Sequence, residues 1–360
     1  MSVVPVRGPD EPEAYMAPPP FKKPLKTQPP MTEYDPTFLQ RKEQVGEQVF
    51  TLKNGRRLTY YTEGNPSDPA VLCLHGLSCN KYLWLQPEPA PGVYMICPDR
   101  QGHGHSSPYE PGKRSEFLYS AVVPEFMELL DELKVDKFYV VGHSMGASTT
   151  VQIAAAHPER VLGIAPIAAM ADVWDGSMSS KVRKKAMGLP GIDRIRHNGC
   201  KSAFVRKLVS SLFVYHSDKT LDPGFRQWHN GWLVHSGCTA KSKAACNENT
   251  FFLTKMCDQL HYGGNCANYG LVEQSRQWGG PHCYPTKAIT CPAFIYHGKK
   301  EQAVHPVHAE HLHKLINGSE LVVMNEHGHG SIGIEYENII LALVQGKSAT
   351  GTFGNSSDFK

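Results

Sequence analysis

Apolar positions along the chain follow two rhythms, one typical of buried strands and one typical of helices. Short apolar runs that end in a glycine or a turn predict strands buried on both faces. In stretches such as FLYSAVVPEFMELLDEL, apolar residues instead recur every three or four positions, which predicts helices. Strands that alternate with helices indicate an α/β fold with a mostly parallel, doubly wound sheet. The expected strands lie within 70–76, 93–107, 137–146, 161–170, 292–298 and 320–328, and the expected helices are 117–133 and 145–161.

Both ends of the chain lack these rhythms. Residues 1–45 are rich in proline and predict a disordered tail, and residues 347–360 predict a shorter flexible tail. The regular pattern starts at residue 46, where alternating residues flank Asn54-Gly55, a signal for a hairpin turn.

The middle of the chain breaks the α/β pattern. Residues 175–288 are richer in Cys, Trp, His, Asn and Gly, and they contain helical pieces such as 201–216. We interpret this segment as an inserted, mainly helical cap or lid. It separates two parts of one α/β core, residues 46–174 and 289–346.

The charge balance limits the classes of partner. The chain has 37 basic and 34 acidic residues, a formal net charge of +3, and so lacks the basic excess typical of nucleic-acid-binding proteins. Residues 181–211 contain nine Lys or Arg and one acid, which favours a solvated helix surface. The alternatives are steering of an anionic substrate and peripheral contact of the cap with a membrane. No apolar run approaches the roughly 18 residues of a transmembrane helix.

The N-terminus shows no secretory signal, so we expect a cytoplasmic or other intracellular location. Reduced thiols are then expected for the ten cysteines, which form no C-x-x-C pair. The histidine-rich stretch 305–314 is interpreted as a solvated helix face. We therefore predict no metal site.

One motif combines these elements with chemistry. The strand within 137–146 runs into Gly142, Ser144 and Gly146, and a predicted helix follows at once. A strand–G-x-S-x-G–helix unit is a nucleophile elbow, in which larger residues at the two glycine positions collide with the turn. The sequence thus predicts an exposed serine hydroxyl at a helix N-terminus, where developing negative charge is stabilised.

Four motifs in order resemble the α/β-hydrolase fold family, in its capped, serine esterase- or lipase-like form. They are LHGLS (74–78), DRQGHGHSS (99–107), GHSMGA (142–147) and NEHGHGSI (325–332). The resemblance spans roughly residues 46–346. It implies a small-molecule, ester-like substrate and no cofactor.

The resemblance also assigns the nucleophile and the base. Ser144 matches the nucleophile, and His329 matches the base because the family places that histidine directly after a glycine, here Gly328. His327 is the competing base, and otherwise a candidate for lining the substrate pocket.

The oxyanion hole is implied in the same way. Its donors would be the backbone N–H groups of Leu77 and Met145. His75 and Asp99 are interpreted as structural residues of their turns. Trp174, at the start of the cap, is a second candidate for lining the pocket.

The acid of the triad departs from the family pattern. The usual aspartate position, three residues after the glycine that ends a late strand, is Glu301. Glutamate has the same charge on a longer side chain and is our preferred assignment. The alternatives are Asp172 or Asp175, in an earlier loop, or a site without a proper acid.

These assignments predict a serine hydrolase that acts on carboxylic esters, or on thioesters or lactones, through an acyl-enzyme. The serine argues against epoxide or haloalkane chemistry, for which the resemblance implies an aspartate. The alternative is a non-catalytic or weakly catalytic ligand-binding protein of the same fold, which only Glu301 favours.

Overall fold

The computed structural model describes residues 35–77, 79–107, 119–173, 175–186, 238–265, 282–352 and 354–359. Its strands are β1 Gln48–Thr51, β2 Arg57–Glu63, β3 Ala70–Leu74, β4 Tyr94–Pro98, β5 Phe138–His143, β6 Val161–Ile167, β7 Phe294–Gly298, β8 Glu320–Met324 and β9 Asn355–Ser356. Its α-helices are α1 Pro36–Val45, α2 Tyr119–Glu132, α3 Met145–Ala156, α4 Ser180–Ala186, α8 Ala240–Glu248, α9 Thr250–Asn265, α11 Val307–Leu315 and α12 Tyr336–Val344. The short 3-10 helices are η1 Lys81–Trp84, η6 Thr286–Ala288 and η7 Ser331–Glu335.

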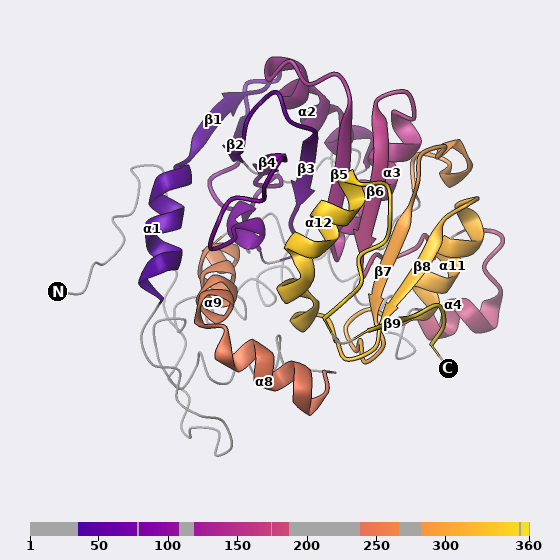
Figure 1. Ribbon diagram of the computed structural model, residues 1–360. Coiled ribbons are helices and arrows are strands. Elements are labelled where there is room, and N and C mark those ends of the chain that lie inside the picture. The colour runs from indigo at the N-terminus through magenta and orange to yellow at the C-terminus, as the bar shows by residue number, and fades with distance from the viewer. Residues whose placement is uncertain are drawn as a thin grey trace, which may run out of the picture.

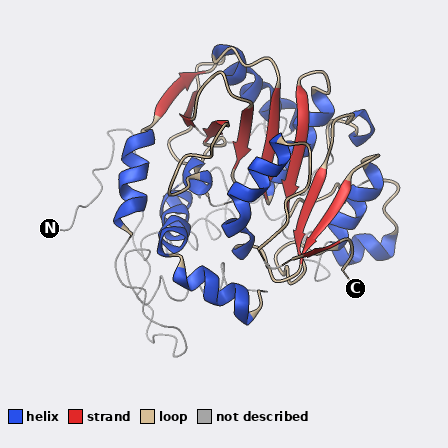
Figure 2. Cartoon of the chain, viewed as in Figure 1, coloured by secondary structure: helices blue, strands red, loops and turns tan. Residues whose placement is uncertain are grey.

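The described strands form one sheet in the order β1-β2-β4-β3-β5-β6-β7-β8-β9. Pairing is parallel from β4 through β8 and antiparallel at both edges, where β1 and β2 form the predicted hairpin and β9 pairs with β8. The predicted mostly parallel α/β sheet is thus confirmed (Figures 1 and 2).

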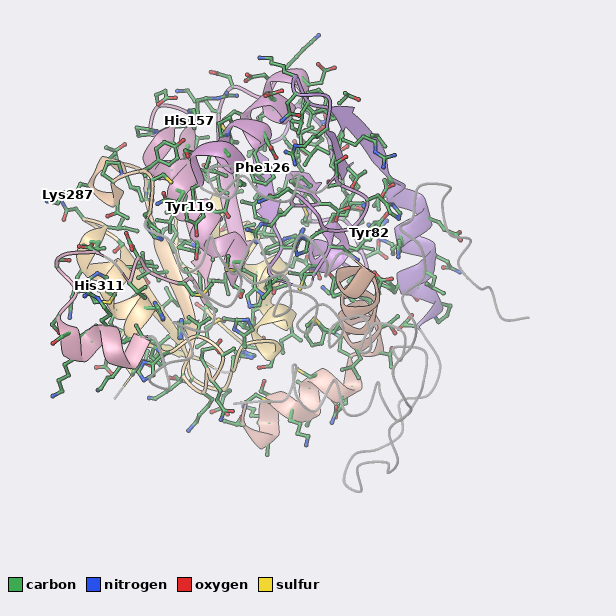
Figure 3. All side chains as sticks on the ribbon, turned by 180° about the vertical axis from the view of Figure 1, so that it is seen from behind. Tyr82, Tyr119, Phe126, His157, Lys287 and His311 are labelled. Carbon is green, nitrogen blue, oxygen red and sulfur yellow. The ribbon has the colours of Figure 1, made fainter. Side chains whose placement is uncertain are left out.

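Helices cover both faces of the sheet. Successive residues of β3 point to opposite sides, so Leu72 packs in one apolar core and Cys73 in another. The first core takes in α2, α3 and α11, and Figure 3 shows Tyr119 and Phe126 of α2 on that side. The second core takes in α12, η1 and α9. Burial on both faces explains why the central strands are continuous apolar runs.

The predicted N-terminal tail is wrong for its last residues, because 36–45 are helix α1. Asp35 caps the helix by accepting a hydrogen bond from the backbone N–H of Thr37 at 2.8 Å, and Pro36 occupies the first turn. Phe38 is buried and packs edge-on against Phe251 of α9, with ring centroids 5.5 Å apart. Proline favours the first turn of a helix, so a proline at this position is compatible with an ordered helix start.

The predicted C-terminal tail is also wrong. Ala349 is buried, and its backbone N–H donates to the Tyr296 hydroxyl at 2.7 Å. Beyond it, Asn355 and Ser356 form β9 on the edge of β8. The backbone N–H of Gly354 donates to the carbonyl oxygen of Gly351 at 3.0 Å, in a turn that precedes β9.

The predicted cap is described only in part. Helices α4, α8 and α9 belong to it, and α8 and α9 lie beyond the carboxyl ends of the parallel strands (Figure 1). The predicted helical piece 201–216 lies outside the described residues. None of the helices described is long and apolar enough to cross a membrane. The cysteines whose side chains are described are free.

Candidate active site

Ser144 lies in a strained turn between β5 and α3. Its backbone has φ 55° and ψ −117°, a region that residues other than glycine rarely adopt. A Cβ atom on Gly142 would lie 2.5 Å from the carbonyl oxygen of Gly146. A Cβ atom on Gly146 would lie 2.2 Å from the carbonyl oxygen of Leu74. Glycine is therefore required on both sides of Ser144, as the motif predicts.

The loop after β8 brings His329 to Glu301. The Nδ1 atom of His329 lies 2.7 Å from Oε2 of Glu301, which follows β7. The other oxygen of Glu301 accepts hydrogen bonds from the backbone N–H groups of Ala303, at 2.6 Å, and Val304, at 3.0 Å. These bonds fix the carboxylate, so the longer glutamate side chain holds a defined position against the imidazole.

The charges of this pair support each other. Burial raises the pKa of Glu301, but the charge and hydrogen bond of His329 outweigh it and lower the pKa to about 2. Burial lowers the pKa of His329, but the charge and hydrogen bond of Glu301 raise it above its ordinary value. Because a carboxylate only accepts hydrogen bonds, Nδ1 of His329 carries a proton. In the neutral ring, Nε2 is then the basic nitrogen.

The two alternative acids have other partners. Asp172 accepts a hydrogen bond from the backbone N–H of His282 at 3.0 Å. Asp175 accepts one from the backbone N–H of Ser177 at 2.8 Å and lies 3.6 Å from His311. Within the described part of the chain, Glu301 is the carboxylate that contacts His329.

The loop after β3 lies against the nucleophile elbow. A Cβ atom on Gly76 would be 3.1 Å from Cβ of Ser144, so Leu77 follows a residue in close contact with the turn. Met145 is the first residue of α3. Neither the Leu77 nor the Met145 backbone N–H donates a hydrogen bond to any residue that the structure describes.

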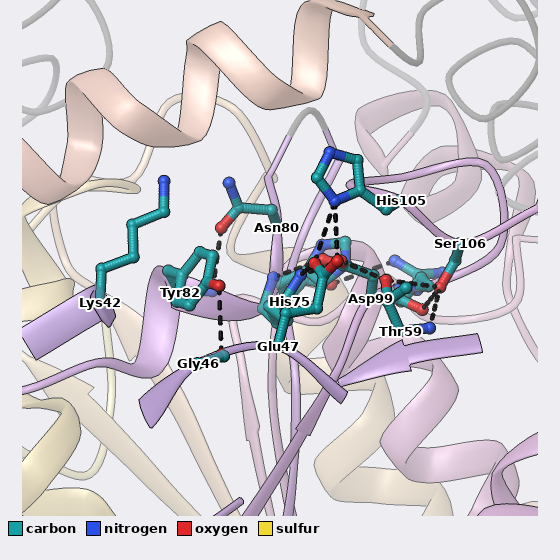
Figure 4. Close-up of polar contacts among 12 residues, drawn as sticks. Lys42, Gly46, Glu47, Thr59, His75, Asn80, Tyr82, Asp99, His105 and Ser106 are labelled. Carbon is teal, nitrogen blue, oxygen red and sulfur yellow. Dashed lines mark hydrogen bonds and ion pairs between the residues drawn. The ribbon is translucent and has the colours of Figure 1, made fainter. Parts of the chain in front are cut away.

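His75 holds the loop after β3 in place by hydrogen bonds. Its Nε2 accepts a hydrogen bond from the backbone N–H of Arg100 at 2.9 Å, and its Nδ1 lies 2.8 Å from the carbonyl oxygen of Gly76. Asp99 accepts hydrogen bonds from both the backbone N–H, at 2.7 Å, and the Nζ, at 2.6 Å, of Lys81. It also accepts one from the Thr59 hydroxyl at 2.7 Å (Figure 4). Both residues therefore fix turns, in line with their structural interpretation.

His143, inside the elbow motif, is a further residue of the site that its local sequence does not identify. Its ring centroid is 4.6 Å from that of His329, and its Nε2 lies 3.1 Å from the backbone carbonyl oxygen of His329. Burial, with the nearby charge of His329, lowers the pKa of His143 to about 3, so the ring is neutral. Nε2 therefore donates to that carbonyl and fixes the loop beside Ser144.

The two pocket candidates have different outcomes. His327 is buried and contacts Ser242 of α8 and Glu335, so its prediction as a pocket-lining residue is wrong. Both ring nitrogens face protein groups that were not recognisable from the local sequence. Trp174 lies outside the described residues.

A small apolar cluster lies at the carboxyl edge of the sheet, separate from the two main cores. Met145, Met170 and Val304 are buried in it, and Leu77 packs against them. These residues follow β5, β6, β7 and β3, which are neighbouring strands. The cluster therefore provides apolar surroundings on the side of the elbow where both candidate oxyanion donors lie.

A parallel sheet with helices on both faces and a strained serine at a carboxyl strand end define an α/β-hydrolase architecture. A family model for the alpha/beta hydrolase fold matches residues 69–194. The chain thus has the α/β-hydrolase fold, and its residues 69–194 are similar to that family.

The similarity to known proteins extends over different parts of the chain. A putative 2-succinyl-6-hydroxy-2,4-cyclohexadiene-1-carboxylate synthase of Bacillus subtilis (strain 168) is 33% identical over 32% of the chain and 42% of that relative. A fluoroacetate dehalogenase of Burkholderia sp is 33% identical over 28% of the chain and 34% of that relative. A hydrolase structure from Pseudomonas aeruginosa PA01 covers 83% of this chain and 98% of its own, with 17% identity and a TM-score of 0.58. The chain thus matches less than half of these two curated relatives.

Proposed function

We propose that this protein is a serine hydrolase that cleaves carboxylic esters, or the related thioesters or lactones, through an acyl-enzyme intermediate. The observation that carries the proposal is the 2.7 Å contact between His329 Nδ1 and Glu301 Oε2 on the loops that flank the elbow serine. The matched family model, that of the alpha/beta hydrolase fold, and the similarity to a fluoroacetate dehalogenase support a hydrolase in the broad sense.

In the first half of the reaction, Oγ of Ser144 attacks the substrate carbonyl while Nε2 of His329 accepts its proton. Glu301 keeps the ring in the required tautomer and stabilises the imidazolium that forms. The backbone N–H groups of Leu77 and Met145 donate to the developing oxyanion, each contributing on the order of 3 kcal/mol. His329 then gives its proton to the leaving alcohol, thiol or lactone oxygen.

In the second half, His329 accepts a proton from water, and the resulting hydroxide attacks the acyl-enzyme. Collapse of the second tetrahedral intermediate releases the acid and restores Ser144. The apolar cluster of Leu77, Met145, Met170 and Val304 favours an apolar group beside the scissile carbonyl.

Glu301 was the feature that favoured ligand binding without turnover. Its contact with His329, and its pKa of about 2, support instead a carboxylate that performs the usual role of the triad acid.

The test is labelling with a fluorophosphonate probe, followed by peptide mapping. We expect rapid labelling at Ser144, and none in the variant Ser144→Ala. Absence of labelling in the folded wild-type protein, together with no turnover of p-nitrophenyl acetate, would contradict the proposal and favour the ligand-binding alternative.

A further inference from the structure

A second serine–histidine–glutamate chain lies beside the candidate active site. The ring of His327 lies between Ser242 of α8, whose Oγ is 3.2 Å from Nδ1, and Glu335, whose Oε1 is 3.3 Å from Nε2. The exposed fractions of Ser242, His327 and Glu335 are 0%, 1% and 0%. No substrate reaches groups this buried, so their role must lie in the structure around them.

The charge of Glu335 fixes the direction of the chain. Its carboxylate also accepts hydrogen bonds from the Asn338 side chain, at 2.9 Å, and the Thr352 backbone N–H, at 2.8 Å. Burial raises the pKa of Glu335, but the hydrogen bonds from His327, Thr352 and Asn338 outweigh it and lower the pKa to about 2. Nε2 of His327 faces this carboxylate in an ion-pair contact at 3.3 Å. When its proton is on Nε2, the ring accepts a hydrogen bond from Ser242 at Nδ1.

The backbone of His327 joins the two loops that carry the candidate base and acid. Its carbonyl oxygen accepts a hydrogen bond from the backbone N–H of Lys300 at 3.0 Å, one residue before Glu301. A Cβ atom on Gly298 would lie only 2.4 Å from the same oxygen, so the end of β7 packs tightly against it. His329 follows two residues later. A shift of His327 therefore displaces both partners of the His329–Glu301 contact.

Helix α8 is attached to the same loop by a second set of bonds. The backbone N–H of Thr239, its N-cap residue, donates to the carbonyl oxygen of Glu326 at 3.1 Å. The Thr239 hydroxyl also donates to the Glu326 carboxylate. The start of α8 is thus bonded to Glu326 and His327, two consecutive residues of the loop after β8 (residues 325–330, here called the histidine loop).

We propose that His327 is a positioning residue, which transmits the placement of helix α8 to the base His329 and the acid Glu301. The inference rests on the proposed function for its effect on catalysis, but not for its effect on the geometry of His329. When the Ser242 hydroxyl is removed, the His327 ring loses the partner of its Nδ1 atom on helix α8. The loop then samples positions in which His329 and Glu301 are less well aligned.

The variant Ser242→Ala tests this coupling against a matched control, Thr254→Val. Thr254 is likewise a buried hydroxyl on a helix of the predicted cap, and it accepts a hydrogen bond from the backbone N–H of Asp35 at 2.9 Å, far from the histidine loop in sequence. We expect Ser242→Ala to lower kcat for p-nitrophenyl acetate about tenfold, because misplacement by 1 Å costs up to about a hundredfold. KM should change less than twofold. Thr254→Val should change kcat less than twofold. Ser242→Thr, which keeps the hydroxyl, should have a kcat close to that of the wild type.

The second readout does not depend on turnover. The NMR titration of His329, with labelled histidine rings, should give an apparent pKa closer to the ordinary value in Ser242→Ala than in the wild type or Thr254→Val. An unchanged titration in a folded Ser242→Ala variant, or equal shifts in both variants, would overturn the coupling. If the wild-type protein neither labels at Ser144 nor turns over ester, the proposed function fails, while the titration still decides the coupling.

Discussion

The loop after β8 carries two histidines, each facing a glutamate, and the two pairs differ in access and in the nitrogen that is bound. His329 contacts Glu301 through Nδ1, and its side chain is 16% exposed. His327 contacts Glu335 through Nε2, and its side chain is 1% exposed, with Ser242 at Nδ1. No described residue binds Nε2 of His329. The same two residue types thus give a candidate base, whose Nε2 is bound by no described residue, in one pair and a buried contact between loop and helix in the other.

Replacing each histidine by glutamine should separate these roles most strongly. We expect His329→Gln to lower kcat at least about 10⁴-fold with little change in the thermal midpoint, because the proton acceptor is lost. His327→Gln keeps a donor toward Glu335 but loses the acceptor for Ser242, so we expect a loss of about 10- to 100-fold. Steady-state hydrolysis of p-nitrophenyl acetate, with thermal unfolding of the same samples, measures both. Equal losses of kcat would contradict the comparison.

Replacement of Glu301 should affect mainly catalysis, whereas replacement of Glu335 should affect mainly stability. Glu301→Gln should lower kcat by about 10³- to 10⁴-fold, because the amide no longer holds the catalytic tautomer or stabilises the imidazolium. Glu335→Gln should act mainly on the free energy of unfolding, by about 1–3 kcal/mol, because a buried charged acceptor is lost. Kinetics and urea denaturation of the two variants test this. A larger loss of kcat in Glu335→Gln than in Glu301→Gln would contradict the roles assigned to the two glutamates.

The pH dependence of kcat/KM tests the effect of Glu301 on His329. His329 must be neutral to accept a proton, and Glu301 raises its pKa above the ordinary value of 6.5. We therefore expect kcat/KM to fall as the pH drops through this raised pKa. In Glu301→Gln, the remaining activity should fall at a lower pH, because burial then acts without the opposing carboxylate. A profile of kcat/KM from pH 5 to 9 in both proteins makes the measurement, and coinciding midpoints would contradict the assignment.

Lys255, a buried lysine that contacts no carboxylate among the described residues, should affect stability and not catalysis. The Nζ of Lys255 donates to the carbonyl oxygen of Leu85 at 3.0 Å, and burial lowers its pKa to about 7. An unfolded lysine keeps its proton up to about pH 10.4, so between these values the unfolded state binds more protons and stability rises with pH. The slope should be at most about 1.4 kcal/mol per pH unit. Urea denaturation between pH 7 and 9 should show this slope, and Lys255→Met should reduce it.

Local patterns were sufficient to predict the parallel sheet and the elbow. The apolar runs alone identify the central strands, since burial on both faces leaves no polar positions. Gly142 and Gly146 are needed by the turn itself, so the motif contains its own steric reason. The pairing of Glu301 with His329 is the assignment that the motif spacing favours. Whether the glutamate carboxylate contacts the imidazole depends on the conformation of the loop after β7, which local patterns do not predict.

Contacts between distant segments were not predictable. His327 and Ser242 are 85 residues apart, and nothing near His327 indicates a partner on α8. The histidine-rich stretch was wrongly predicted to form a solvated face, because His308 and His311 are buried in the fold. Nδ1 of His308 accepts a hydrogen bond from the backbone N–H of Ala171 at 3.1 Å, so a polar ring fills an interior position that periodicity assigns to the surface.

The short strand β9 has a consequence for shortened versions of the chain. A protein that ends at residue 346, where the sequence suggests the core stops, would lose the pairing of Val323 and Met324 with Ser356 and Asn355. Strand β8 would then become an open edge, and open apolar edges pair with other molecules. We therefore expect residues 355–356 to protect this edge of the sheet against self-association, and a protein shortened to residue 346 to precipitate at concentrations at which the 360-residue chain stays in solution.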